Sequence, residues 1–222
     1  MKTIICYGDS NTFGYNPANS KKFDDGIYWT SVLQAKLGND YKIINEGVCD
    51  RMGFVDNPKG FEYSARLHFP KFIEEVSNFD IFILWLGTND LQFQNNISLE
   101  VIENGLRNLI NLSKVKAKSI ILIPPVLLDE RVLTGTFNFQ FNKTSIIRSK
   151  EAQSIYEQIA RNENLIYFDL NKFVKPCDID GLHYDKNGHK VIGECLADCI
   201  NKIDMWFISR PLSGMSCKNH RV

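Results

Sequence analysis

Hydrophobic residues fall into five short, continuous runs that are separated by longer amphipathic stretches. The runs are rich in β-branched and aliphatic residues and span Thr3 to Tyr7, Tyr41 to Asn45, Ile81 to Leu86, Ser119 to Ile123 and Leu165 to Phe168. Runs of this length and composition predict β-strands. Because most of them are apolar at successive positions rather than at alternate ones, we expect strands covered on both faces, as in a parallel sheet.

Between these runs, apolar residues recur three and four positions apart, which is the spacing of an amphipathic helix. Helices are predicted from Trp29 to Leu37, from Leu99 to Ile110, from Ala152 to Ile159 and from about Gly188 to Ile203. Gly38 is a candidate helix stop, and Ser98 and Ser149 are candidate N-caps. The alternation of strands and helices predicts an α/β fold, a three-layer α/β/α sandwich.

Two segments, Arg51 to Pro70 and Leu127 to Ile147, break this rhythm and are predicted to be long functional loops or lids. The alternation of predicted strands and helices ends near Trp206. We therefore expect a single domain over residues 1–206, followed by a candidate mobile tail over residues 207–222.

Charge and composition narrow the classes of partner. Lys plus Arg and Asp plus Glu number 26 each, so no net positive field is available to hold nucleic acid. The apolar stretch at the N-terminus is too short for a signal peptide, and the run from Ile81 to Leu86 is too short to span a membrane. A cytoplasmic protein is expected. The six cysteines lack CxxC spacing, and Cys195 and Cys199 fit the apolar face of a helix as buried free thiols.

The residues that follow the predicted strands are polar. The first strand leads into Gly8-Asp9-Ser10-Asn11-Thr12, the second into Asn45-Glu46-Gly47, and the third into Gly87-Thr88-Asn89-Asp90. After the fifth comes Asp178-Ile179-Asp180-Gly181-Leu182-His183. Ligands of open parallel sheets bind at the carboxyl ends of the strands, so we expect these side chains to converge at one edge.

This set of residue types suits nucleophilic catalysis. A serine hydroxyl needs a neighbouring base, and the base needs a third group to hold its tautomer. His183 and Asp180, three residues apart, fit these two roles beside Ser10. The backbone N–H groups of Ser10 and Gly47 and the side-chain amide of Asn89 are candidate donors to an oxyanion.

The four blocks Gly8-Asp9-Ser10, Gly47, Gly87-Thr88-Asn89-Asp90 and Asp180-Gly181-Leu182-His183, in this order and spacing, resemble the SGNH (GDSL-type) hydrolase superfamily. The stretch Gly8 to Gly14 with Asn45-Glu46-Gly47 resembles its small arylesterase, acyltransferase and lysophospholipase-like branch. The resemblance covers residues 3 to about 200. Cys49 and Asp50 depart from it, because many relatives have small or hydroxyl residues there.

The resemblance implies a flavodoxin-like sandwich with about five parallel strands. It also implies hydrolysis or transfer of acyl groups from small-molecule esters without a cofactor. By position, Ser10 would be the nucleophile, His183 the base, Asp180 its orienting carboxylate, and Gly47 and Asn89 oxyanion donors.

Each block alone has a structural explanation, because Gly, Ser, Asp and Asn are also common turn and capping residues. A non-catalytic or nucleotide-binding α/β module is the alternative, although the loop Gly8 to Gly14 has neither GxGxxG nor GxxxxGK[ST]. The acidic residues near His183 miss the calcium-loop pattern, so no metal site is predicted. His68 and His189 are predicted to be structural. The oligomeric state stays open, and a homo-oligomer is compatible with the sequence.

Aromatic residues gather in the two long segments, and their function has two interpretations. They could line an acyl or aryl pocket, or they could pack the loops onto the domain or form a subunit contact. These residues are Phe54, Phe61, Tyr63, Phe137, Phe139 and Phe141.

Overall fold

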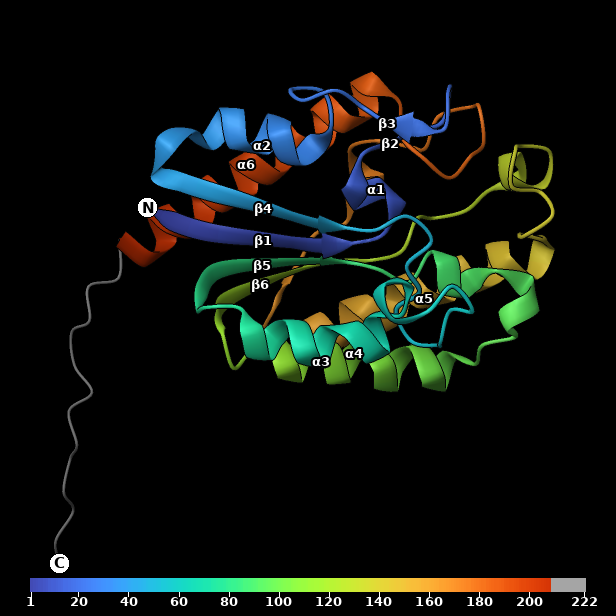
Figure 1. Cartoon of the computed structure of the whole chain (residues 1–222), viewed down its shortest axis with the longest axis horizontal. Coiled ribbons are helices and arrows are strands. Elements are labelled where there is room, and N and C mark those ends of the chain that lie inside the picture. The colour runs from blue at the N-terminus through green and yellow to red at the C-terminus, as the bar shows by residue number, and fades with distance from the viewer. Residues whose placement is uncertain (209–222) are drawn as a thin grey trace, which may run out of the picture.

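Figure 1 shows a computed structural model of the chain, which describes residues 1–208, with side chains described as far as Ile203. The predicted tail over residues 207–222 falls on the last two residues of the final helix and otherwise lies outside the described residues.

A parallel sheet forms the centre of the fold (Figure 1). Its strands lie in the order β4-β1-β5-β6-β7, and each neighbouring pair is parallel. The strands are β1 (Lys2–Gly8), β4 (Tyr41–Gly47), β5 (Phe79–Trp85), β6 (Ala117–Ile123) and β7 (Ile166–Tyr167). Counted along the chain, this is the 2-1-3-4-5 order of flavodoxin-like sheets. The predicted strands and the predicted α/β class are confirmed.

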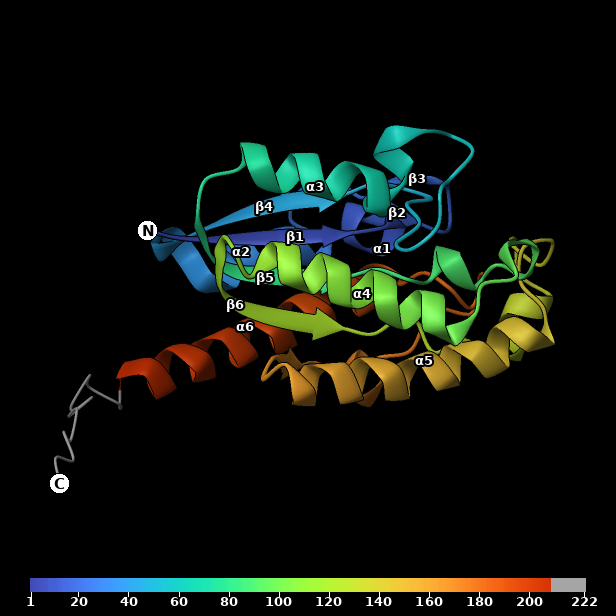
Figure 2. The same ribbon diagram turned by 90° about the horizontal axis from the view of Figure 1, so that it is seen from below.

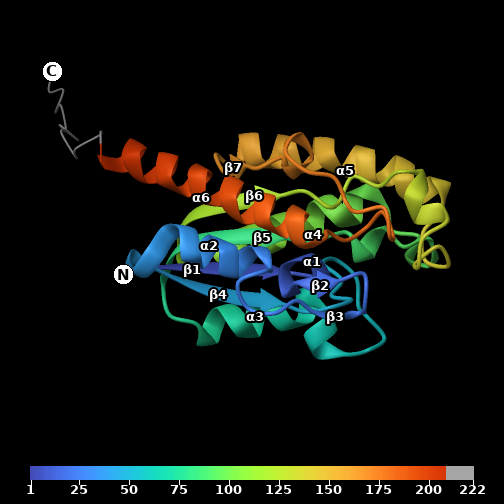
Figure 3. The same cartoon turned by 90° about the horizontal axis from the view of Figure 1, so that it is seen from above.

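Helices cover both faces of the sheet. On one face, α2 (Trp29–Leu37) packs against α6 (Lys186–Ile208) (Figures 1 and 3). The other face carries α3 (Ala65–Glu75), α4 (Leu99–Ser113) and α5 (Lys143–Asn162) (Figure 2). The central strands are almost wholly buried between these layers, which accounts for their continuous apolar sequences.

Short elements cluster beyond the carboxyl ends of the strands. The helix α1 (Ser10–Phe13) follows β1 directly, and the strands β2 (Tyr15–Asn16) and β3 (Lys21–Lys22) form a small antiparallel hairpin (Figure 3). Single 3₁₀ turns span Gly38–Asp40, Phe61–Tyr63, Asn89–Leu91, Phe93–Asn95, Glu130–Leu133 and Leu170–Lys172.

The structure extends the helices beyond the predicted ones in two places. The segment from Arg51 to Pro70 is not loop throughout, because α3 begins at Ala65 and includes Pro70. A proline removes a helical hydrogen bond and disfavours helix in the residue before it, so it masked this helix in the sequence. The helix α5 begins at Lys143, and its N-cap is Asn142.

Ser149 is therefore not an N-cap but lies inside α5. Its Oγ donates to the Ile146 carbonyl at 2.8 Å and accepts from Leu128 N–H at 3.0 Å. Ser98 is the N-cap of α4, as predicted, and accepts from Val101 N–H. Gly38 ends α2 with φ 68°, also as predicted. Cys195 and Cys199 are free but only partly buried, in contrast to the buried thiols expected.

None of the helices within residues 1–208 combines the length and the apolar character needed to cross a bilayer.

The capping box of α5 gives a stability prediction. The Asn142 side chain accepts from Ser145 N–H at 3.1 Å, while Ser145 Oγ accepts from Asn142 N–H at 3.2 Å. Asn142→Ala removes the cap and should lower the free energy of unfolding by about 1 kcal/mol in urea denaturation. Thr144→Ala, at an exposed position of the same turn, is the matched control and should change stability far less. Equal losses in the two variants would contradict the assigned cap.

Candidate active site

The predicted site residues follow neighbouring strands of the sheet. Ser10 follows β1, Gly47 ends β4, and Asn89 follows β5, and these three strands are adjacent in the sheet. Chain connections leave β1 and β5 in opposite directions at this point of a 2-1-3-4-5 sheet, which opens a crevice for ligands. The segment that carries Asp180 and His183 enters the same edge just before α6.

A tight turn presents Ser10. Asp9 is the N-cap of α1, and its Oδ1 accepts from Asn11 N–H at 3.0 Å. The backbones pack so closely here that glycine is required on both sides. A Cβ on Gly8 would lie 2.6 Å from the Trp85 carbonyl oxygen, and a Cβ on Gly47 would lie 2.1 Å from Phe13 N. These contacts account for the glycines of the first two blocks.

The structure brings Ser10, His183 and Asp180 together. Ser10 Oγ lies 2.8 Å from His183 Nε2, and His183 Nδ1 lies 2.8 Å from Asp180 Oδ2. All three residues are buried, with Ser10 the most exposed at 9%. The second oxygen of Asp180 accepts from Leu182 N–H at 2.9 Å and from His183 N–H at 2.8 Å.

The charge state of Asp180 sets the tautomer of His183. Burial works to raise the pKa of Asp180, but the hydrogen bonds from His183 and from two backbone amides outweigh it and hold that pKa below its ordinary value. An ionised carboxylate can only accept hydrogen bonds, so Nδ1 carries the imidazole proton. Nε2 is then left to accept from the Ser10 hydroxyl, which is the arrangement that a general base requires.

Neighbouring segments fix this arrangement. Asn11 Nδ2 donates to the Leu182 carbonyl at 3.3 Å, which ties the serine turn to the histidine segment. Arg131 donates to the Pro176 carbonyl and to Asp178, both at 2.7 Å. Gly135 lies against the backbone of Asp180, where a Cβ would approach its Cα to 2.7 Å. The segment from Leu127 to Ile147 therefore helps to hold the backbone that carries Asp180 and His183.

The candidate oxyanion donors differ in their present partners. The N–H of Ser10 lies in the first turn of α1, where a helix leaves its amides without intrahelical partners. Asn89 Nδ2 donates one hydrogen to the Arg51 carbonyl at 3.1 Å, and its second hydrogen has no partner among the described residues. The N–H of Gly47 already donates to Asn45 Oδ1 at 2.9 Å.

Two further buried residues, Asp90 and Arg51, hold together the backbone around the site. Neither was predicted from the sequence to have this role. Asp90 accepts from Gly53 N–H at 2.7 Å and from Phe54 N–H at 2.8 Å. The guanidinium of Arg51 is buried and donates to the Gly8 carbonyl at 3.1 Å, linking this loop to β1. Asp90 belongs to the block Gly87-Thr88-Asn89-Asp90, whereas nothing in the sequence distinguishes Arg51 from a surface arginine.

Aromatic rings flank His183. The Tyr15 ring centroid lies 4.4 Å from that of His183, and the Phe137 ring lies 5.5 Å away, edge to face. Of the other loop aromatics, Phe54 and Phe141 are buried in the core, while Phe139 is 64% exposed. Phe54 and Phe141 therefore pack the loops onto the domain, and the pocket interpretation stays a prediction for the other loop aromatics.

His68 and His189 occupy packed positions. Tyr7 Oη lies 2.9 Å from His68 Nδ1, and Trp29 N–H donates to His189 Nδ1 at 3.2 Å. Burial lowers the pKa of His189 to about 4, which keeps its ring neutral. These contacts fit the structural roles predicted for both.

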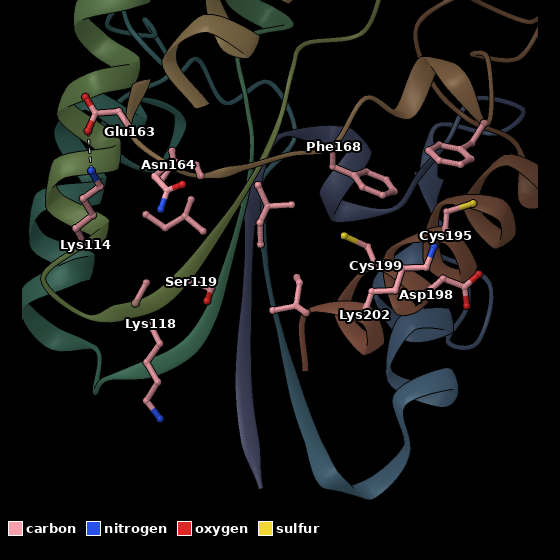
Figure 4. Close-up of a pocket in the computed structure, with 16 residues that line it drawn as sticks. Lys114, Lys118, Ser119, Glu163, Asn164, Phe168, Cys195, Asp198, Cys199 and Lys202 are labelled. Atoms are coloured by element: carbon pink, nitrogen blue, oxygen red, sulfur yellow. Dashed lines mark hydrogen bonds and ion pairs between the residues drawn. The ribbon is translucent and has the colours of Figure 1, made fainter. Parts of the chain in front are cut away.

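One cavity of the described part of the chain has a volume of about 900 Å³ (Figure 4). Its walls come from the amino ends of β6 and β7 and from α6, including Ser119, Cys195 and Cys199. None of the predicted site residues lines it.

Comparisons with known proteins assign the chain to a family. Residues 4–196 match the family model described as GDSL-like lipase/acylhydrolase. The chain therefore belongs to the GDSL-like lipase/acylhydrolase family, as the resemblance implied. Its class of activity is serine-dependent hydrolysis of carboxylic esters.

Several solved structures share the fold. An aryl esterase from M. smegmatis is 23% identical, with a TM-score of 0.81 over 91% of this chain and 99% of that chain. A carbohydrate acetylesterase family member from Sinorhizobium meliloti is 25% identical, with a TM-score of 0.82 over 91% and 99%. A carbohydrate acetylesterase from the same organism is 23% identical, with a TM-score of 0.79 over 91% and 100%. No curated protein matches the chain.

Asp9 generates a pH prediction. It is 1% exposed, and its Oδ2 has no hydrogen-bond partner among the described residues. Burial, with a smaller contribution from Asp90, raises its pKa to about 7. The ordinary pKa of aspartate is about 3.9, so folding requires Asp9 to hold a proton that the unfolded chain releases. The contribution of protonated Asp9 to the free energy of unfolding is fully present below about pH 4 and is lost as the pH rises towards 7.

Asp9→Asn keeps the capping oxygen and cannot ionise. Its free energy of unfolding relative to the unsubstituted chain should therefore grow between about pH 4 and pH 7 and level off above, when measured by urea denaturation. The control Asp24→Asn removes an exposed carboxylate and should show no such trend. A difference that stays constant across this range would mean that Asp9 is ionised in the folded chain.

Proposed function

We propose that the chain hydrolyses small carboxylic esters through an acyl-enzyme on Ser10, with His183 as general base and acid and Asp180 as its orienting carboxylate. The single observation that supports this proposal most is the 2.8 Å contact between Ser10 Oγ and the acceptor nitrogen of His183. A serine with only a structural role in a helix would not require a buried imidazole whose other nitrogen binds a carboxylate.

The reaction has two displacement steps. Ser10 Oγ attacks the ester carbonyl carbon while His183 Nε2 takes the hydroxyl proton. The resulting oxyanion accepts hydrogen bonds from Ser10 N–H and Asn89 Nδ2, and collapse of the intermediate breaks the bond to the leaving oxygen, which receives the proton from His183. Water then attacks the acyl-enzyme, His183 takes its proton, and Ser10 is regenerated with release of the acid. An alcohol in place of this water would give acyl transfer by the same chemistry.

Gly47 is the third proposed oxyanion donor. Because its N–H is bonded to Asn45 Oδ1, it can act on an oxyanion only if that hydrogen bond opens or becomes shared. We therefore expect Ser10 and Asn89 to contribute more than Gly47.

The structural neighbours support small ester substrates. Aryl esters and carbohydrate acetates are named for those proteins and are the first substrates to test on this chain. The single domain over residues 1–206 and the cytoplasmic location also stay proposals. The fold and the charge balance offer no argument for a nucleic-acid partner.

Loss of the nucleophile is the direct test. Ser10→Ala should abolish turnover of p-nitrophenyl acetate and covalent labelling by a fluorophosphonate probe, because both need the Ser10 oxygen. Ser154→Ala, an exposed serine on α5, is the matched control and should retain both. Undiminished turnover by Ser10→Ala would refute the assignment. Binding of nucleotides in a thermal-shift screen, together with no labelling of the unsubstituted chain, would favour the nucleotide-binding module.

Loss of one oxyanion donor should affect the chemical step. Asn89→Ala should lower kcat for p-nitrophenyl acetate about 10²-fold to 10³-fold, with a smaller change in KM, because this hydrogen bond strengthens in the transition state. Asn104→Ala, on the exposed face of α4, should leave kcat unchanged. If kcat stays within a few-fold in Asn89→Ala, Asn89 does not belong to the oxyanion hole.

A further inference from the structure

A buried arginine, Arg51, contacts several segments around the candidate site. It is 1% exposed. Its guanidinium donates to the carbonyls of Gly8 and Glu62, each at 3.1 Å, and to the carbonyl of Glu46. The guanidinium also lies over the Tyr7 ring, with Cζ 4.3 Å from the ring centroid. One side chain therefore joins β1, β4 and the 3₁₀ turn before α3.

The surroundings of Arg51 are unusual for a buried charge. The hydrogen-bond partners that the structure describes for its side chain are backbone carbonyls, and none of them is a carboxylate. Burial lowers the pKa of Arg51, yet a guanidinium stays protonated at neutral pH. A well-packed apolar residue often gives a more stable fold than a buried charge does. These contacts therefore indicate a role in placing backbone groups rather than in filling space.

The first of these backbone groups lies next to the nucleophile. The Gly8 carbonyl belongs to the peptide unit that directly precedes the unit carrying Ser10 N–H. It accepts from Arg51 Nη1 and also from Val48 N–H at 3.2 Å, and both donors lie in the segment that follows β4. Movement of this carbonyl would turn the adjoining peptide unit, so Arg51 helps to set the direction of Ser10 N–H.

The second connection runs from the Arg51 backbone to Asn89. The Arg51 carbonyl accepts from Asn89 Nδ2 at 3.1 Å. The other side-chain hydrogen bond of Asn89, from Gln92 Nε2 to Oδ1, is longer at 3.4 Å. The contact with Arg51 therefore does more to orient the carboxamide. Because the guanidinium ties the same residue to β1, Arg51 links the surroundings of both oxyanion donors.

An oxyanion hole requires that its donors reach one oxygen, at about 2.7–3.1 Å. A misplacement of about 1 Å can lower the rate of reaction roughly 10²-fold. We propose that Arg51 is a positioning residue that sets the relative placement of Ser10 N–H and Asn89 Nδ2. It acts through the Gly8 carbonyl and through its own carbonyl, without touching the reacting atoms. The inference rests on the proposed ester hydrolysis and deepens it.

The variant Arg51→Met keeps an unbranched apolar stem and removes the guanidinium. Its kcat for p-nitrophenyl acetate should fall about 10-fold to 10²-fold with little change in KM, because the oxyanion donors act mainly in the transition state. We express kcat per chain labelled by a fluorophosphonate probe at completion, so misfolded chains do not contribute. The matched control is Arg66→Met, which removes an exposed arginine paired with Asp56 and should leave kcat unchanged. Unchanged kcat in Arg51→Met would overturn the proposal.

The variant Arg51→Lys separates geometry from charge, and it decides the proposal if Arg51→Met does not fold. Lysine keeps the positive charge but lacks the planar fork that donates to several carbonyls. Its kcat per labelled chain should therefore fall by a similar factor. Full kcat in Arg51→Lys would mean that the charge alone suffices, and the positioning role would be wrong.

Binding of phenylboronic acid reports on the oxyanion hole rather than on the fold. This inhibitor forms a tetrahedral anion on a nucleophilic serine, so its Ki should rise in Arg51→Met by about the factor by which kcat falls. An unchanged Ki beside a lowered kcat would place the loss outside the oxyanion hole and would contradict the role of Arg51.

A double-mutant cycle tests the connection between Arg51 and Asn89. In Arg51→Met/Asn89→Ala, the combined loss of kcat should be several-fold smaller than the product of the two single losses. The reason is that the Arg51 carbonyl has no carboxamide left to orient once Asn89 is truncated. Single losses that simply multiply would overturn this connection.

These results distinguish the role of Arg51 from the proposed function. Normal hydrolysis by the unsubstituted chain, together with unchanged kcat in both Arg51 variants, would overturn the role of Arg51 and leave the proposed function intact. If the unsubstituted chain neither hydrolyses p-nitrophenyl acetate nor reacts with the fluorophosphonate probe, the proposed function itself is contradicted.

Discussion

The contact between Ser10 and His183 constrains the rest of the molecule, because the two residues are 173 positions apart in the chain. A separation of 2.8 Å can be kept only if the first strand and the segment before the last helix end at one edge of a rigid sheet. The strand order β4-β1-β5-β6-β7 meets this requirement by placing β1 near the centre. The helix α6 begins at this edge, just after His183, and packs on α2 (Figure 3).

Close backbone approach at this edge explains why small residues and buried polar groups occur side by side. Gly8 and Gly47 allow the serine turn to contact both neighbouring strands. Buried polar groups at this edge bind backbone groups of neighbouring segments, while Asp9 Oδ2 has no partner among the described residues. Asp90 accepts from backbone amides of the loop that follows β4, and Arg51 in that loop donates to the Gly8 carbonyl of β1. These hydrogen bonds thereby fix the backbone segments that surround the proposed catalytic groups.

Much of this architecture could be predicted from the sequence, because strands buried on both faces and amphipathic helices have distinct periodicities. The candidate site could be predicted too, since Ser10, Asn89 and His183 each follow a strand or precede a helix in a recognisable block. Contacts between segments that lie far apart in the chain could not be predicted from the sequence. The helix α3 was masked by Pro70, and the start of α5 was obscured because its first turns carry exposed polar residues and a cap at Asn142. The hydrogen bond from Phe93 N–H to the Gln140 carbonyl likewise joins two segments whose distance only the fold determines.

The loop between β6 and α5 serves several parts of the site at once. Gly135 packs against the backbone of Asp180, Phe137 lies against His183, and the Gln140 carbonyl accepts from Phe93 N–H. One stretch of a few residues thus supports the proposed acid and base and also holds a neighbouring loop in place. In protein engineering, an insertion or deletion in this stretch would alter these contacts together, so the stretch is best exchanged as a whole.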